Sequence, residues 1–187
     1  MIHITSDQIE NIVTRLASEI KRDYPDQKFV LLGVLNGAYQ FTSDLSKHFS
    51  ENVILDFTQL KSYDGTKTTK EVKMILPPRA PIAGNTIIVI ENIVDSGFSM
   101  KWLKGELTNM GAKEVRICTL LNKQARRQVD ITADYIGTEI DDEFVVGYGM
   151  DYNGYYRTPP DIRSLTEEEI ENGKPMWQKK TLINVFF

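Results

Sequence analysis

Two apolar patterns alternate along the chain, one with the spacing of a helix and one continuous. From residue 6 to about residue 24, apolar side chains recur every three or four positions, which predicts an amphipathic helix capped by Ser6 or Asp7. Continuous apolar runs are typical of strands that are buried on both faces of a sheet. Such a run occupies residues 29–35, and residues 86–90 and 115–121 are further strand-like runs.

The segments between these strands complete an alternating order. A helix is predicted from the turn at residues 36–37 to about residue 49, and another over residues 98–109, ended by Gly111. Further strands are predicted at residues 53–60, 72–76, 135–137 and 144–146. This order indicates the α/β class, with a mainly parallel central sheet flanked by helices. Because no repeat or linker interrupts the pattern, residues 1–187 are predicted to form a single domain.

The bulk composition narrows the class of protein. The formal net charge of −4 counts against a surface that binds nucleic acid. Cys118 is the only cysteine, so an internal disulfide is impossible, and we expect it to be a small core residue. The N-terminus lacks the regions of a signal peptide, and no apolar run approaches the ~20 residues that cross a bilayer. We therefore expect a cytoplasmic protein that binds neither nucleic acid nor membrane.

One strand–helix junction carries a candidate anion site. The strand at residues 86–90 runs into Glu91 and Asn92, and the loop at residues 95–99 then leads into a helix. Ligands gather at the carboxyl ends of strands in open α/β sheets, and the unpaired N–H groups of a helix start suit a phosphate. Gly97 lets the backbone approach such a phosphate closely. The alternative is a plain junction at which the first two loop residues only cap the helix.

Five stretches resemble a known family. Residues 88–97 resemble the phosphoribosyl-pyrophosphate signature of type I phosphoribosyltransferases. Four further stretches resemble the hypoxanthine–guanine branch of that family in order and spacing, and Arg157 completes the last of them: Gly33–Tyr39, Leu60–Tyr63, Leu120–Lys123 and Phe144–Asn153. The resemblance covers about residues 29–157, which is most of the chain.

The resemblance implies a fold and an activity. The fold is that of type I phosphoribosyltransferases, with a small hood, a mobile lid loop at about residues 62–71 and a C-terminal extension at about residues 160–187. The activity is purine salvage, in which hypoxanthine and/or guanine and 5-phosphoribosyl 1-pyrophosphate give the nucleoside monophosphate and pyrophosphate. Mg²⁺ is the implied cofactor, and a homodimer or homotetramer is the implied assembly. Residues 181–187 are apolar and β-prone, which leaves a terminal strand, a subunit contact and a sticky tail open.

The resemblance also implies residue roles around the sugar. Asp95 resembles the general acid/base that serves the purine N7. The 5′-phosphate would be bound by Asp95, Ser96, Gly97, Phe98 and Ser99. Glu91 and Asn92 would contact the ribose and a metal, and the metal ligands would be Glu91 and Asp151.

The remaining roles concern the base and the leaving group. The purine would contact Lys123, Phe144, Val145 and Asp151. A lysine only donates hydrogen bonds, so Lys123 favours a 6-oxopurine over adenine. The pyrophosphate would contact Leu35, Asn36, Gly37, Ser62, Tyr63 and Arg157. In this family the loop that corresponds to residues 35–37 often contains a non-proline cis peptide bond. Each assignment has an alternative. Lys123 could be a solvated lysine at a strand end, Phe144 could be a core aromatic, and Asp151 and Arg157 could form ordinary surface ion pairs.

Two positions depart from the family pattern. Asn92 stands where the family usually has a second acid, which predicts weaker binding of phosphoribosyl pyrophosphate or magnesium than an aspartate would give. Asn36 replaces a basic residue that is often found in its loop. Asn92 keeps open a second class of function, a non-catalytic regulator that binds a nucleotide or phosphoribosyl pyrophosphate. An RNA-binding regulator on the same fold is a third class, which the net charge disfavours.

Overall fold

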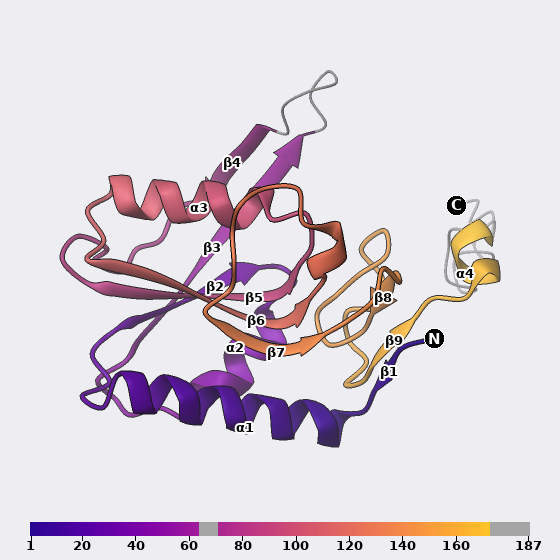
Figure 1. Ribbon diagram of the computed structural model, residues 1–187, viewed down its shortest axis with the longest axis horizontal. Helices are drawn as coiled ribbons and strands as arrows, with labels where there is room; N and C mark the ends of the chain where they lie inside the picture. Colours follow the sequence, from indigo (N-terminus) through magenta and orange to yellow (C-terminus); the bar gives the residue numbers. More distant parts are fainter. Residues whose placement is uncertain (64–70, 173–187) are drawn as a thin grey trace, which may run out of the picture.

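The computed structural model describes residues 1–63 and 71–172. Its centre is a six-stranded sheet with the order β4-β3-β2-β5-β6-β7 (Figure 1). The strands are β2 (Val30–Leu35), β3 (Ile54–Tyr63), β4 (Glu71–Leu76), β5 (Thr86–Val94), β6 (Glu114–Asn122) and β7 (Tyr135–Glu139). Neighbouring strands are parallel except β3 and β4, which pair antiparallel. The prediction of a mainly parallel sheet is confirmed.

Helices cover both faces of this sheet, with α1 and α2 on one face and α3 on the other (Figure 1). Their bounds are α1 (Ser6–Asp23), α2 (Tyr39–Ser46) and α3 (Phe98–Asn109). Alternate residues of β5 serve the two layers, because Ile88 and Ile90 pack with α1 and α2 while Ile87 and Val89 pack with α3. Successive side chains of a strand point to opposite faces. A strand covered on both faces therefore has to be continuously apolar, which is the pattern that predicted it.

A small sheet lies beside the carboxyl ends of the large one. Its strand order is β1-β9-β8, and all its pairs are antiparallel. The elements are β1 (His3–Ile4), β8 (Val145–Val146) and β9 (Ile162–Ser164), and α4 (Glu167–Asn172) follows. We call this sheet, together with residues 147–161 that join β8 to β9, the hood. Figure 1 shows β1 and β9 side by side, so the hood combines segments from opposite ends of the described chain.

The N-terminus of α1 differs from the sequence prediction. Thr5 caps this helix, not Ser6 or Asp7. The hydroxyl of Thr5 accepts from the backbone N–H of Gln8 at 3.3 Å, and Oε1 of Gln8 accepts from the backbone N–H of Thr5 at 2.9 Å. This reciprocal pair is a capping box, which satisfies two N–H groups where a single cap satisfies one.

Other elements were shorter than predicted or were missed. α2 ends at Ser46, because the N–H groups of residues 47–49 bond three residues back instead of four. The sequence did not predict β1, β9 or the 3₁₀ helix η1 (Gln124–Arg126). Residues 181–187 and most of the predicted lid lie outside the described residues.

Two expectations about the whole chain can be compared with this fold. Cys118 is buried in the core, as predicted, and this burial raises the pKa of its thiol. Across residues 1–63 and 71–172, none of the helices has the length and apolar character needed to span a membrane.

Candidate active site

A cavity of about 520 Å³ lies where the carboxyl ends of β2, β3, β5 and β6 face the hood. Its walls come from the ends of these strands, from the loop after β5, from Phe144, and from hood residues between 145 and 157. A smaller hollow of about 260 Å³ adjoins it along residues 91–100. These dimensions are typical of sites for small molecules.

The loop of residues 95–97 joins β5 to α3 without a side-chain cap. Gly97 is the N-cap residue, and its φ of 87° lies in the left-handed region. A Cβ at this position would lie 2.6 Å from Cγ2 of Ile131 and 2.8 Å from Cδ of Arg127, so only glycine fits. The alternative in which the first two loop residues merely cap the helix is therefore wrong.

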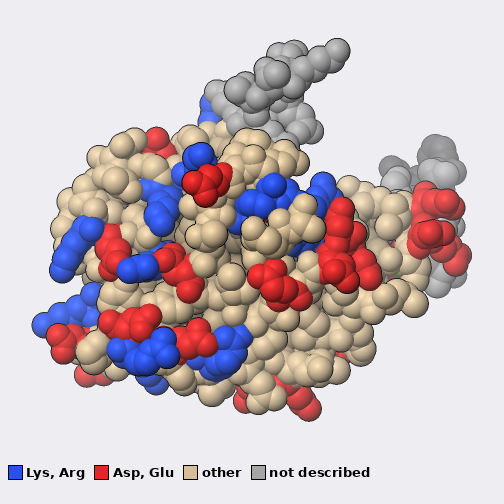
Figure 2. Space-filling model, in the orientation of Figure 1, with Lys and Arg blue, Asp and Glu red and all other residues tan. Residues whose placement is uncertain are grey.

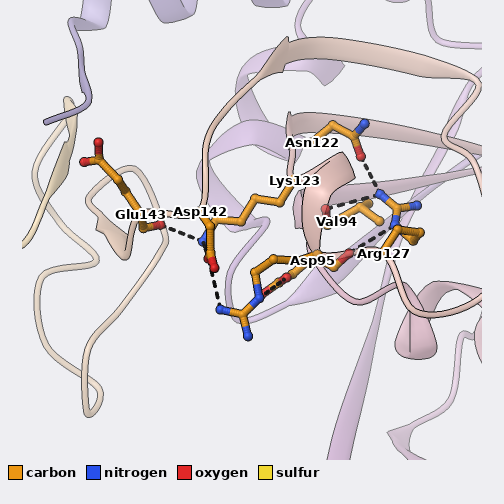
Figure 3. A network of polar contacts seen from close by, with 8 residues as sticks. Val94, Asp95, Asn122, Lys123, Arg127, Asp142 and Glu143 are labelled. Atoms are coloured by element: carbon orange, nitrogen blue, oxygen red, sulfur yellow. Dashed lines mark hydrogen bonds and ion pairs between the residues drawn. The ribbon is translucent and has the colours of Figure 1, made fainter.

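Arg127, the residue that follows η1 (Gln124–Arg126), holds this loop through hydrogen bonds (Figure 3). Its Nε donates to the backbone carbonyl of Asp95 at 3.0 Å, and its Nη2 donates to Oδ1 of Asn122 at 2.5 Å. Its Nη1 donates to the backbone carbonyl of Ile131 at 2.5 Å. Burial lowers the pKa of this guanidinium. A partly buried cation thus fixes the loop backbone, and no local pattern in the sequence had indicated it.

The side chain of Asp95 lines the cavity and contacts a second arginine. Its Oδ1 lies 3.1 Å from Nε of Arg126, and Nη1 of Arg126 lies 3.1 Å from Oδ1 of Asp142 (Figure 3). Arg126 also lines the cavity, although the sequence prediction had not included it.

Two residues with opposite exposure form the next part of the wall. The side chain of Lys123 is 6% exposed, and its Nζ donates to the backbone carbonyl of Glu143 at 2.6 Å. Phe144 is 48% exposed and meets the ring of Tyr152 edge-on, with 5.4 Å between ring centroids. Lys123 is therefore not a solvated lysine, and Phe144 is not a core aromatic. Val145, in β8, lines the same wall.

The turn after β2 is held between the sheet and the hood. The peptide bond between Leu35 and Asn36 is cis, as the resemblance implied. A Cβ on Gly37 would lie 2.7 Å from Nδ2 of Asn92, so the Asn92 side chain lies directly against the turn. From the hood, Gly149 meets the carbonyl oxygen of Gly37 so closely that a Cβ on Gly149 would overlap it.

An acid and an arginine of the hood pair with each other at the cavity wall. Oδ1 of Asp151 lies 2.8 Å from Nη2 of Arg157, and Oδ2 of Asp151 accepts from the backbone N–H of Gly154 at 2.7 Å. Nη1 of Arg157 donates to the backbone carbonyl of Gly149 at 2.7 Å. The alternative interpretation predicted an ordinary surface ion pair for Asp151 and Arg157. The two residues do form an ion pair, but it lies in the wall of the cavity and not on an open surface.

At the end of β5, Glu91 and Asn92 also face the cavity. Burial raises the pKa of Glu91 to about 8. Oε1 of Glu91 accepts from the backbone N–H of Asn92 at 2.8 Å.

Known proteins resemble this chain over nearly its whole length. The family model for the phosphoribosyl transferase domain matches residues 5–153. A hypoxanthine-guanine phosphoribosyltransferase of Staphylococcus aureus (strain Mu50) is 37% identical over 170 residues, which cover 90% of this chain and 95% of the relative. The chain belongs to the hypoxanthine-guanine phosphoribosyltransferase family.

Two solved structures agree with this assignment of the phosphoribosyltransferase fold. The crystal structure of a hypoxanthine-guanine phosphoribosyltransferase from Bacillus anthracis is 38% identical, with a TM-score of 0.81, over 87% of this chain and 96% of that one. A variant of the Trypanosoma cruzi hypoxanthine phosphoribosyltransferase, complexed with the product IMP, is 28% identical, with a TM-score of 0.85, over 94% of this chain and 95% of that one.

The cavity of this phosphoribosyltransferase gathers most of the side chains that the resemblance had singled out. They are Leu35, Gly37, Glu91, Asn92, Asp95, Ser99, Lys123, Phe144, Val145, Asp151 and Arg157. Ser96 and Gly97 line the adjoining hollow. Asn36 and Phe98 line neither of the two, and the side chains of Ser62 and Tyr63 lie outside the described part of the structure.

Proposed function

We propose that this chain transfers the phosphoribosyl group of 5-phosphoribosyl 1-pyrophosphate to a ring nitrogen of hypoxanthine and/or guanine. The products are the nucleoside monophosphate and pyrophosphate. The observation that carries the proposal is the cavity, which joins a hollow at a helix start to a wall with Asp95, Lys123 and Phe144. The relative that was crystallised with IMP supports the same product class.

The 5′-phosphate is assigned to the loop of residues 95–99. The backbone N–H groups at the start of α3 and the positive end of its dipole suit an anion. The hydroxyls of Ser96 and Ser99 line the hollow, where they can donate to phosphate oxygens. Arg127 keeps the loop backbone in place through the carbonyl of Asp95.

The purine is assigned to the wall between Lys123 and Phe144. The ammonium of Lys123 donates to the 6-oxo group, and the exposed ring of Phe144 stacks on the base. Val145 offers backbone groups to the purine edge, with Asp151 nearby. Asp95 acts as the general acid/base at N7, so that proton transfer accompanies bond formation at the sugar.

The pyrophosphate is assigned to the turn at residues 35–37 and to Arg157. A guanidinium presents a planar fork of donors, which matches phosphate oxygens. Arg157 exchanges its contact with Asp151 for the pyrophosphate when the substrate binds. We also assign Ser62 and Tyr63, at the start of the proposed lid at about residues 62–71, to the pyrophosphate, and closure of that lid would exclude water from the reacting centre.

The oxygen ligands at the cavity fit Mg²⁺. Among the described residues, there is no group of three acidic, histidine or cysteine side chains that could enclose a metal ion. Mg²⁺ instead takes one or two carboxylates together with water and substrate phosphates. Glu91 and Asp151 both line the cavity and can supply those carboxylates, with Asn92 toward the ribose. Binding of the metal to Glu91 would release the proton that burial favours on this side chain. The bound metal would neutralise the charge of the pyrophosphate.

We further propose a cytoplasmic homodimer or homotetramer of single-domain subunits, with the purine and phosphoribosyl pyrophosphate as its partners. One face of the molecule supports small-molecule rather than RNA ligands. On the face drawn in Figure 2, lysine and arginine side chains alternate with acidic ones instead of forming a continuous basic patch.

A direct assay tests this function. The purified chain is incubated with Mg²⁺, phosphoribosyl pyrophosphate and hypoxanthine, guanine, xanthine or adenine, and nucleotide formation is followed. We expect turnover with hypoxanthine or guanine and little with adenine. Binding of phosphoribosyl pyrophosphate without turnover would instead support a non-catalytic regulator, and salt-sensitive RNA binding would support the third class of function.

Asn92→Asp is expected to tighten the binding of magnesium or phosphoribosyl pyrophosphate. Asn92 is 5% exposed, and its side chain lies against the turn at Gly37. A second carboxylate here raises the local negative charge, which a divalent cation relieves. We expect a lower half-saturating Mg²⁺ concentration or a lower KM for phosphoribosyl pyrophosphate.

The matched control for this variant is Asn52→Asp, at an exposed asparagine that does not line the cavity. It makes the same chemical change and should leave both constants unaltered. Kinetics and magnesium dependence that are the same for Asn92→Asp and the wild type would show the prediction to be wrong.

A further inference from the structure

Lys123 and Arg126 lie on one side of a tight turn. Lys123 is the residue before η1, and Arg126 is the last residue of η1, three positions later. In a 3₁₀ helix, which has three residues per turn, side chains three positions apart eclipse one another. Both cations line the cavity, and both reach the segment before β8, where Nζ of Lys123 contacts the carbonyl of Glu143 and Nη1 of Arg126 contacts the carboxylate of Asp142.

The contact of Arg126 with Asp95 concerns the carboxylate itself. Oδ1 of Asp95 is shielded from solvent, and within the described ranges no group donates a hydrogen bond to it. The ion pair with Nε of Arg126, at 3.1 Å, lacks the geometry of a hydrogen bond, so its attraction for this oxygen is electrostatic. Arg127 holds only the backbone carbonyl of Asp95. Two successive arginines thus divide the task, because one fixes the loop and the other fixes the reacting side chain.

We propose that Arg126 is a positioning residue that aims the Asp95 carboxylate at the purine subsite and ties it to Asp142 across the edge of the cavity. The inference rests on the proposed function. The forked guanidinium contacts Asp95 through Nε and Asp142 through Nη1, which the single ammonium of a lysine cannot imitate fully. A proton-transfer group that is already held in the reactive geometry lowers the entropic cost of reaching the transition state.

Arg126→Gln is the first test. The three side chains of the network are between 41% and 55% exposed, so the effect is modest. We expect kcat for nucleotide formation to fall about 3- to 10-fold, in line with the modest contribution of a partly exposed ion pair. The KM for phosphoribosyl pyrophosphate should stay near its wild-type value, because the phosphate loop is held by Arg127. Arg126→Lys keeps the charge and should give a kcat between those of Arg126→Gln and the wild type.

A double-mutant cycle with Asp95→Asn distinguishes positioning from a structural role. If Arg126 acts through Asp95, Arg126→Gln should change kcat by less than about 1.5-fold in the Asp95→Asn background. Arg22→Gln is the matched control, since Arg22 pairs with Asp23 at the exposed end of α1 and does not line the cavity. Melting temperatures of all variants report whether the fold is intact.

The outcomes separate this inference from the function on which it rests. If the wild type forms no nucleotide, the proposed function fails. With an active wild type, an unchanged kcat in Arg126→Gln, or the same fold-loss in both backgrounds, overturns the inference. A kcat for Arg126→Lys no higher than that of Arg126→Gln also contradicts it. A loss confined to the background with Asp95 supports it.

Discussion

Asp95→Asn is expected to lower kcat for nucleotide formation by about 10²- to 10⁴-fold, the usual contribution of a general acid/base. Asparagine keeps the size and shape of the side chain but cannot exchange a proton with N7. The KM for phosphoribosyl pyrophosphate should change little, because we assign the phosphate to the backbone of the loop around Gly97, which Arg127 holds in place. Steady-state kinetics with hypoxanthine as the varied substrate measure both constants.

The control for this variant is Asp130→Asn, which removes the same charge at an exposed position away from the cavity. It should keep the wild-type kcat. An Asp95→Asn enzyme that retained most of the wild-type kcat would remove Asp95 from the chemistry, and a parallel rise in the KM for phosphoribosyl pyrophosphate would assign it to phosphate binding instead.

Lys123→Gln is expected to weaken the preference for 6-oxopurines. We assign the buried ammonium of Lys123 to the 6-oxo group as a charged donor, and we expect the loss of such a hydrogen bond to lower kcat/KM for hypoxanthine by about 10- to 100-fold. A glutamine amide can turn its carbonyl oxygen toward the 6-amino group of adenine, which an ammonium cannot do. The ratio of kcat/KM for hypoxanthine to that for adenine should therefore fall, as competition between the two bases would measure.

Lys113→Gln is the matched control, because Lys113 is exposed and does not line the cavity. Lys123 also donates to the carbonyl of Glu143, so the melting temperature of Lys123→Gln has to be measured alongside its kinetics. A stable Lys123→Gln enzyme with an unchanged ratio between the two bases would contradict the assignment of this residue to the 6-oxo group.

The fold was predictable where the signal is local. α3 has the predicted bounds, because a glycine precedes it and the polar end at Asn109 leads to Gly111. β5 was recognised from its apolar run, although it continues to Val94 through the polar pair at residues 91–92. The pairing of β1 with β9 could not be predicted, because two and three residues carry too little pattern and their partners lie at distant points of the chain.

The site was predictable mainly through the resemblance. Spacing alone placed an anion site after β5, but it could not bring Lys123 and Phe144 to the same wall, since the contact between Lys123 and Glu143 depends on how the hood folds over the sheet. Arg126 had a signal that was not used: three positions separate it from Lys123, which is the period of a 3₁₀ turn after a strand. Arg127 had none, because its partners are backbone carbonyls that only the folded chain assembles.

The contact between Gly149 and the carbonyl of Gly37 sets how this enzyme can diversify. The two backbones are in direct contact there, and no side chain lies between them that could change its conformation to absorb a shift. The hood and the turn after β2 should therefore move together. Substitution at Gly149 would push the hood away from the turn after β2 and displace the cavity walls that both of them form. In a laboratory selection for activity on a new base, we therefore expect substitutions at wall residues such as Phe144. We expect Gly37 and Gly149 to stay unchanged.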